Sequence, residues 1–378
     1  MSKSIYKRLL LGIVSILLLS SCSMMTEEEP DCNPYYKVRF RFDRNMQYAD
    51  AFSTQVGEVD LYVFDKSGKL VWSGHESGSI LSEEGYMMDL PVAPGNYDIV
   101  AWCRKRHENA AGFNMAGGAT PTSFQDLRMT MEREHEGSKA TSQTDLDALF
   151  HGIIKDVELP DEWGVHTVTM PLTKDTNSIR IMLVHLNGEK VNERDFEFKI
   201  TDSNGYLDSN NAILEDETIE YRPWAVHEGI AQTLPPIVTE EESRGRGPAA
   251  GRGDGSRSSG GNSFARVKKE ASENIETGRG ITEIHSLVAE MTTSRLQTCR
   301  RPVLTVTRRY DGVKIIEIPI NDYFLMVRSE HFRQMEEDEF LDRQDDYSMT
   351  LFLDENNSWY KAVVDILSWR LVLQGTDL

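Results

Sequence analysis

The feature of this sequence that most limits its fold is an alternation of apolar and polar residues that recurs in short segments. The first clear example is YKVRFRF, in which Val38, Phe40 and Phe42 alternate with Lys37, Arg39 and Arg41. Successive side chains of a β-strand point to opposite faces, so a period of two predicts a half-buried strand. This strand would be apolar on its inner face and basic on its outer face.

Many later segments repeat the pattern, and Gly, Asn, Asp and Pro separate them. The predicted strands cover 58–65, 69–74, 155–160, 166–173, 178–186, 196–202, 302–309, 313–320, 347–354 and 363–373, and the segment 87–103 contains a Pro-Gly turn and another strong strand. The first two flank the turn Asp65-Lys66-Ser67-Gly68 and predict a hairpin. Helical spacing of apolar residues is convincing only at 322–344, and a shorter helical turn is expected at 123–132. Short strands spaced by turns predict an all-β fold of antiparallel sandwiches.

The beginning of the chain has the order of an export signal. Lys3, Lys7 and Arg8 precede an apolar run from Leu9 to Leu19, which is too short for a membrane span of about 20 residues. No later apolar stretch approaches that length. We therefore expect residues 1–21 to be a removable signal peptide.

A cysteine stands where such a signal would end. Leu19-Ser20-Ser21-Cys22 resembles the lipobox of bacterial lipoproteins, which implies a diacylglycerol on the Cys22 thiol, cleavage before Cys22 and acylation of the new N-terminus with palmitate or a similar chain. An ordinary secretory signal with a chance cysteine is the alternative. Two or three acyl chains together hold a protein stably on a membrane.

An acidic run follows the cysteine, and the whole chain is acidic. Glu27, Glu28, Glu29 and Asp31 predict a solvated tether over residues 22–34, and they also resemble the surface-export signal of Bacteroidetes-type lipoproteins. The formal net charge of −20 argues against binding to nucleic acid, which depends on Lys and Arg contacts to phosphate.

Three cysteines remain besides Cys22, and their odd number excludes a fully paired disulfide framework. Cys103 ends the apolar segment IVAWC and is expected to be a small buried residue. The pattern leaves open whether Cys32, Cys103 and Cys299 form any disulfide. No two cysteines are close enough in sequence to predict a metal-binding pair.

Residues from about 240 to 280 are rich in Gly, Arg and Ser and nearly devoid of apolar side chains, so they predict a flexible insertion without a core. Within it, Arg252-Gly253-Asp254 spells the tripeptide that integrins recognise. The triplet is either a host-cell adhesion motif or a chance product of composition. If host-cell adhesion were unchanged after Asp254→Glu, the adhesion-motif interpretation would be discarded.

The sequence offers no catalytic constellation. It contains no H-E-x-x-H or G-x-S-x-G motif, and its glycine run lacks the strand and helix that a nucleotide loop requires. Asp202-Ser203-Asn204-Gly205 weakly resembles a calcium loop, but Asn-Gly more simply predicts a hairpin turn with a positive φ. We expect no enzyme activity, cofactor or metal.

Several short motifs occur together in one order. They are the lipobox Cys22, LYVFD at 61–65, APGNYDIVAW at 93–102, LFHG at 149–152, PLT at 171–173, Tyr221-Arg222-Pro223, FLDRQDDYSMTLFL from Phe340, and Trp359 with ILSW at 366–369. This succession resembles the fimbrial anchor family of Bacteroidales, which includes the anchor of the minor (short) fimbriae of Porphyromonas. The Gly/Arg/Ser insertion departs from the family pattern and leaves the bounds of the second domain in doubt.

The resemblance implies two tandem transthyretin-like Greek-key β-sandwich domains, at 35–173 and 174–378, in a surface-exposed lipoprotein of the outer membrane. It implies that the protein anchors fimbriae and limits their length, with the shaft subunit and accessory fimbrial proteins as partners. Such subunits join by strand complementation, in which a strand of one completes a sheet of another.

The last predicted strand is a candidate for this contact. Trp369, Leu371 and Leu373 alternate with polar or smaller residues. The strand is either a core edge strand of the second domain or the partner of the first shaft subunit. A surface or pilus-tip adhesin that binds a host ligand or glycan is the alternative function, and exposed rings of Trp72, Trp163 or Trp224 would favour it.

Overall fold

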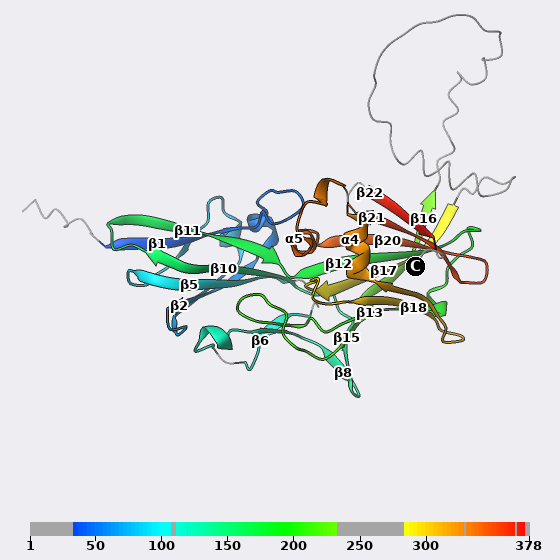
Figure 1. The fold of residues 1–378 in the computed structure, drawn as a ribbon, viewed down its shortest axis with the longest axis horizontal. Coiled ribbons are helices and arrows are strands. Elements are labelled where there is room, and N and C mark those ends of the chain that lie inside the picture. Colours follow the sequence, from blue (N-terminus) through cyan, green and yellow to red (C-terminus); the bar gives the residue numbers. More distant parts are fainter. Residues whose placement is uncertain are drawn as a thin grey trace, which may run out of the picture.

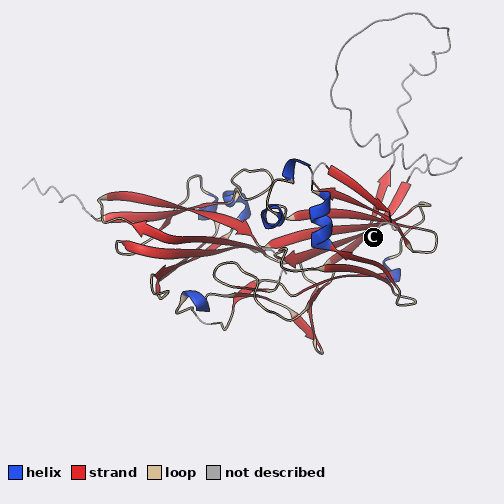
Figure 2. Ribbon diagram, viewed as in Figure 1, coloured by secondary structure: helices blue, strands red, loops and turns tan. Residues whose placement is uncertain are grey.

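The computed structural model describes residues 33–106, 111–118, 120–232, 283–328, 330–366 and 369–374. Strands dominate an elongated body, and the helices are few and short (Figures 1 and 2). The predicted all-β fold class is confirmed. Cys22, Cys32 and the Arg252-Gly253-Asp254 triplet lie outside the described residues.

Three larger sheets and one small sheet form the body. The order of the seven-stranded sheet is β3 (Leu70–Ser77), β2 (Glu58–Asp65), β5 (Gly95–Lys105), β10 (Ala148–Leu159), β11 (Gly164–Lys174), β1 (Pro34–Arg41) and β4 (Met88–Asp89). One six-stranded sheet has the order β16 (Ala225–Gln232), β17 (Glu283–Ser294), β12 (Thr176–His185), β20 (Asp346–Leu353), β21 (Trp359–Ile366) and β22 (Trp369–Gln374). The other has β19 (Lys314–Pro319), β18 (Val303–Arg308), β13 (Phe196–Asp202), β15 (Ile219–Tyr221), β9 (Lys139–Ser142) and β8 (Glu134–Glu136). The small sheet joins β14 (Tyr206–Leu207), β7 (Met129–Met131) and β6 (Phe113–Met115).

The residues of the first strand alternate between buried and exposed positions, as predicted. In β1, Val38 and Phe40 are buried, and the basic residues Arg39 and Arg41 are exposed. This strand runs parallel to β11, with Pro34 opposite Gly164 and Arg41 opposite Pro171. The predicted hairpin is also present as β2 and β3.

The three central strands β2, β5 and β10 carry buried side chains on both faces. In β5, Ile99, Ala101 and Cys103 pack into the core inside the seven-stranded sheet, while Val100 and Trp102 pack into a second core on the other face. This is why IVAWC is a continuous apolar run. Cys103 is fully buried, as expected; its thiol is free, and burial raises its pKa. Cys299 is also free and is exposed.

The second core fills the space between the two six-stranded sheets. Ile181 and Leu351 enter it from one sheet, and Phe198 and Val306 enter it from the other. It is continuous with the outer face of β2, β5 and β10, so the first and second halves of the chain share one apolar core. The strands β8 and β9 come from the first half but join a sheet of the second. The division into domains at 35–173 and 174–378 stays a prediction.

The helix predicted over 322–344 is wrong in extent. The structure has α4 (Ile320–Val327), the 3₁₀-helix η4 (Glu330–Phe332) and α5 (Glu337–Arg343). Apolar spacing is irregular between α4 and α5, so no single stripe can face the core throughout. Three acidic residues open α5, where the helix dipole favours negative charge.

The helical turn expected at 123–132 is also largely wrong. Only the 3₁₀-helix η2 (Phe124–Asp126) forms there, and strand β7 follows it. The alternation of Met129 and Met131, both buried, explains the strand. The remaining short helices among the described residues are α2 (Phe52–Gln55), η1 (Ser79–Ser82) and η3 (Glu193–Asp195).

Asn204 and Gly205 do not form the turn that the sequence suggested. Gly205 is not among the glycines with positive φ, and a Cβ on it would lie 2.6 Å from Cδ1 of the buried Ile219. Asn204 is fully buried, donates to the carbonyls of Ser294 and Arg295, and accepts a 2.6 Å bond from the Tyr221 hydroxyl. The pair is a buried packing element, so the expected hairpin geometry was wrong.

Candidate functional site

Strand β22 lies at the edge of its six-stranded sheet. It pairs antiparallel with β21, from Ile366 opposite Trp369 to Lys361 opposite Gln374. Trp369, Leu371 and Leu373 therefore stand on an edge strand, where the sequence placed a candidate contact. Among the described residues no strand pairs with the other edge of β22. An edge of this kind offers a row of backbone donors and acceptors to a partner chain.

The three tryptophans that would favour glycan binding do not form one platform. Trp72 packs against the core of the seven-stranded sheet. Trp163 is 72% exposed directly before β11, and Trp224 is 43% exposed directly before β16. These two strands belong to different sheets.

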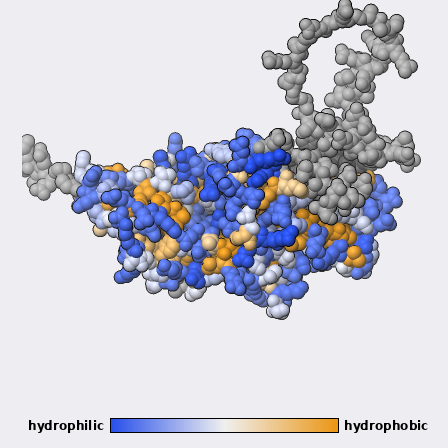
Figure 3. Space-filling model, viewed as in Figure 1, coloured by the Kyte–Doolittle hydropathy of each residue, from blue (hydrophilic) through white to orange (hydrophobic). Residues whose placement is uncertain are grey.

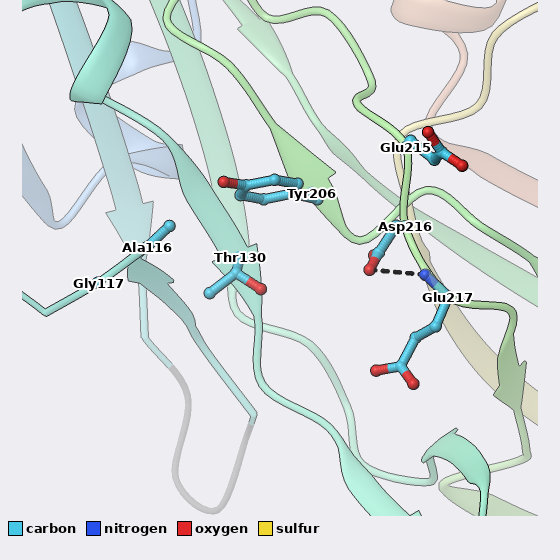
Figure 4. A pocket seen from close by; sticks show the side chains of 7 residues that line it. All are labelled: Ala116, Gly117, Thr130, Tyr206, Glu215, Asp216 and Glu217. Carbon is cyan, nitrogen blue, oxygen red and sulfur yellow. Dashed lines mark hydrogen bonds between the residues drawn. The ribbon is translucent and has the colours of Figure 1, made fainter.

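An open cleft of about 590 Å³ lies between the small sheet and the segment that precedes β15. Figure 4 shows its lining, which consists of Ala116, Gly117, Thr130, Tyr206, Glu215, Asp216 and Glu217. Asp216 lies 2.9 Å from Arg133 and accepts the backbone N–H of Glu217, and Glu217 lies 3.0 Å from His135. Asp216 and Glu217 therefore hold the segment before β15 against Arg133 and His135. Within the described residues no group of His, Cys, Asp and Glu could hold a metal ion.

A buried ionic cluster lies where the two halves of the chain meet. Arg295, at the end of β17, makes two bonds of 2.8 and 2.9 Å to the carboxylate of Asp342 in α5. Its Nε also lies 3.5 Å from Asp175, between β11 and β12. Arg44, from the first half, lies 3.3 Å from Asp342. The cluster therefore ties the start of the chain to the second core.

Burial shifts the pKa of two groups at this junction. It raises the pKa of Asp175 to about 7, although Arg295 opposes the shift and Asn211 donates a 2.7 Å hydrogen bond to the carboxylate. It lowers the pKa of His151 to about 3. The His151 ring lies 4.6 Å from that of Trp102, and its Nε2 lies 3.1 Å from the Ser209 carbonyl.

A second contact across the junction involves Arg343 of α5. Its guanidinium donates a 3.2 Å bond to the Asp43 carbonyl and lies 4.8 Å from the centre of the Tyr48 ring. Sequence reasoning missed the whole junction because its members come from positions up to 300 residues apart and form no local pattern. Asp342 is buried, although in sequence it belongs to an acidic stretch with Asp345 and Asp346.

No helix in the part of the chain that the structure describes is long and apolar enough to cross a membrane.

Comparison with known proteins identifies the family. The family described as "Fimbrillin-A associated anchor proteins Mfa1 and Mfa2" matches residues 28–375. No protein in a search of curated sequences matches this chain. A crystal structure described as a candidate adhesin from Bacteroides thetaiotaomicron is 29% identical, with a TM-score of 0.68 over 91% of this chain and 99% of that one.

Two further solved structures share the fold. A protein from the same organism, described as a candidate polysaccharide-binding protein, is 24% identical with a TM-score of 0.66, covering 91% of this chain and 99% of that one. The fimbrial anchor protein Mfa2 from Porphyromonas gingivalis is 15% identical with a TM-score of 0.57, again over 91% and 99%. The family match spans nearly the whole sequence after residue 27, so this chain belongs to the family of fimbrillin-A associated anchor proteins, which are associated with fimbriae at the cell surface.

Proposed function

We propose that this protein is a lipoprotein of the outer membrane that seats fimbriae on the cell surface and limits their length. The match to an anchor family over residues 28–375 is the observation that carries this proposal. The function is structural rather than enzymatic. One end of the protein is held by lipid, and another part joins the fimbrial shaft.

The lipid end is Cys22. Diacylglycerol on its thiol and a further acyl chain, such as palmitate, on its amine would hold the protein at the membrane. The acidic residues that follow serve as tether and export signal. Strand β1 begins at Pro34, at one end of the elongated body (Figure 1). A tether attached there would leave the rest of the body directed away from the membrane.

The fimbrial end is an open sheet edge, and β22 is the best-placed candidate. It occupies an edge position and belongs to the half of the body away from β1 (Figure 1). The partner is the first shaft subunit, whose strand would extend the sheet by backbone hydrogen bonds. An anchor bound in this way occupies the base and ends growth there, which limits fimbrial length. Accessory fimbrial proteins are further partners.

Replacement of the lipid-bearing cysteine tests the membrane half of this proposal. Cells that carry Cys22→Ala should not incorporate radiolabelled palmitate into this protein, and the protein should leave the outer-membrane fraction. Cys32→Ala, ten positions further along the same tether, is the matched control and should keep both lipid and location. Palmitate labelling of the Cys22→Ala chain equal to that of the unchanged chain would contradict the assignment.

A second candidate function is adhesion, as a surface or pilus-tip protein. The relative that is 29% identical is described as a candidate adhesin, which favours this class of function. Arg252, Gly253 and Asp254 are the candidate contact residues. An Asp254→Glu variant should lose binding to integrin-bearing host cells if the triplet is used, and unchanged binding would leave it as a chance sequence.

A further inference from the structure

The end of the body at which the tether emerges carries exposed apolar side chains. Trp163 is 72% exposed, Val165 is 62% exposed and Tyr35 is 50% exposed. Tyr35 of β1 lies directly opposite Val165 of β11, since these parallel strands pair in register from Pro34 opposite Gly164 onward. Aligned residues of paired strands project to the same side of a sheet. Tyr35 and Val165 therefore lie on one side of the sheet, and Trp163 stands two residues before Val165 in sequence, outside the paired register. We call these three exposed residues the tether-end patch.

The patch lies where the chain leaves the described body. Pro34 starts β1, and its register partner Gly164 directly follows Trp163 in sequence. Figure 3 shows hydrophobic and hydrophilic residues intermixed on the surface of the half of the body that contains β1. Eleven residues lie between Cys22 and Pro34, so even a fully extended tether reaches only about 40 Å. Lipid on Cys22 would thus hold the patch close to the bilayer.

The chemistry of the patch fits the boundary between lipid headgroups and acyl chains. Trp and Tyr rings are enriched there because an apolar ring body and a polar atom can each meet a suitable environment. The charged residues near the patch indicate which kind of lipid surface it would bind. Asp161 and Glu162 are exposed beside Trp163, and Lys37 is paired with Asp89 at 2.6 Å. Exposed carboxylates disfavour a strongly anionic membrane, so the fitting surface is zwitterionic phospholipid.

We propose that the tether-end patch inserts into the headgroup region of the bilayer and forms a second, non-covalent membrane contact of this protein. This inference depends on the proposed lipid at Cys22, which brings the patch to the membrane. A second contact would restrict rotation about the tether. It would fix the direction in which the sheet edges point, whereas lipid alone would leave the body free to tilt.

Tryptophan quenching by brominated phosphatidylcholine tests this contact directly. The full-length lipidated protein is reconstituted into vesicles of zwitterionic lipid with bromine near the headgroup end of the acyl chain. We expect brominated lipid to quench part of the emission and Trp163→Phe to abolish that quenching. Trp224→Phe removes another exposed tryptophan, from the start of β16, and should leave the quenching unchanged.

The outcomes separate this inference from the anchor proposal. Vesicle flotation without quenching of Trp163 would overturn the patch contact and leave the lipid anchor intact. Quenching that persists in Trp163→Phe would assign the contact to another tryptophan and would also overturn it. Failure of the protein with intact Cys22 to float with vesicles would overturn both proposals. Tyr35→Ser with Val165→Thr should reduce Trp163 quenching, because the paired neighbours support its insertion.

Discussion

At the scale of single residues, Gly152 is a position at which the packing of the seven-stranded sheet leaves no room for a side chain. Gly152 of β10 belongs to the LFHG segment, and a Cβ on it would lie 2.7–2.8 Å from atoms of Met170 and Leu172, both fully buried. Overpacking of a filled core costs about 1–3 kcal/mol. We expect Gly152→Ala to lower the free energy of unfolding by this amount, measured by denaturant titration.

A matched control exists a short distance away in the fold. A Cβ on Gly57 would lie 3.6 Å from its nearest neighbour, an ordinary contact distance. Gly57→Ala should therefore change stability by less than about 0.5 kcal/mol. Equal effects of the two substitutions would show that the tight contact at Gly152 does not limit side-chain size.

His151 should make the protein sensitive to acid. Its folded pKa of about 3 lies below its ordinary value of 6.5, because burial disfavours the charged ring. As pH falls below 6.5 the unfolded chain binds a proton that the folded chain does not, so stability declines. Between pH 7 and pH 5 this amounts to about 2 kcal/mol. Over the same pH interval the His151→Gln variant should lose about 2 kcal/mol less free energy of unfolding than the unchanged protein, measured by chemical unfolding at each pH.

The neighbouring carboxyl group acts in the opposite direction. The folded pKa of Asp175 is raised to about 7, so its contribution to stability is present at low pH and is lost as pH rises toward 7. The comparison of His151→Gln with the unchanged protein separates the two groups, since Asp175 is present in both. An identical pH dependence in the two proteins would show that His151 is not held neutral by burial.

At the scale of strands and helices, β22 presents a choice between a structural and an assembly role. Adjacent residues of a strand direct their backbone N–H groups to opposite sides, and proline is tolerated at an edge only where the N–H faces outward. Of the variants Leu371→Pro and Val372→Pro, one should remove a bond to β21 and unfold the edge. The other should fold normally but release fimbriae, as measured by fractionation of cells and medium.

Each variant is the control for the other. The two positions are adjacent in β22, and they differ in the side of the strand to which the backbone N–H points. If both variants unfold, β22 is a structural strand of the second core. If the variant that folds normally still retains fimbriae, the outer edge of β22 is not the assembly surface.

The strands were predictable because their alternation is local. Val38 and Phe40 are enough to identify the inner face of β1 from a few residues. A strand that is buried on both faces instead has a continuous apolar run, as β5 does. The helix over 322–344 was overextended, because apolar spacing does not show where a helix breaks to follow a curved core. Asn204 was misjudged for a related reason. Its polarity suggested a surface turn, but its partners are carbonyls about 90 residues away.

At the scale of the whole molecule, one continuous body would connect the two proposed attachments. The second core extends from between the six-stranded sheets to the outer face of β2, β5 and β10. Arg295, Asp342 and Arg44 connect the halves through charges buried at the same junction. Tension between a membrane and a fimbrial shaft would thus be carried by packed sheets. The family could be predicted from ordered motifs, but this junction could not, because it exists only after the chain has folded.

The central claim is that this chain is the base of a fimbrium. Immunogold labelling of fimbriae released from cells that carry Cys22→Ala tests it most directly, since loss of the lipid should free the fimbria with its anchor attached. We predict gold at one end of each fibre and none along its length, together with fibres shed or abnormally long in cells that lack the protein. Gold along the shaft, or fibres of normal length retained on cells without the protein, would contradict the account.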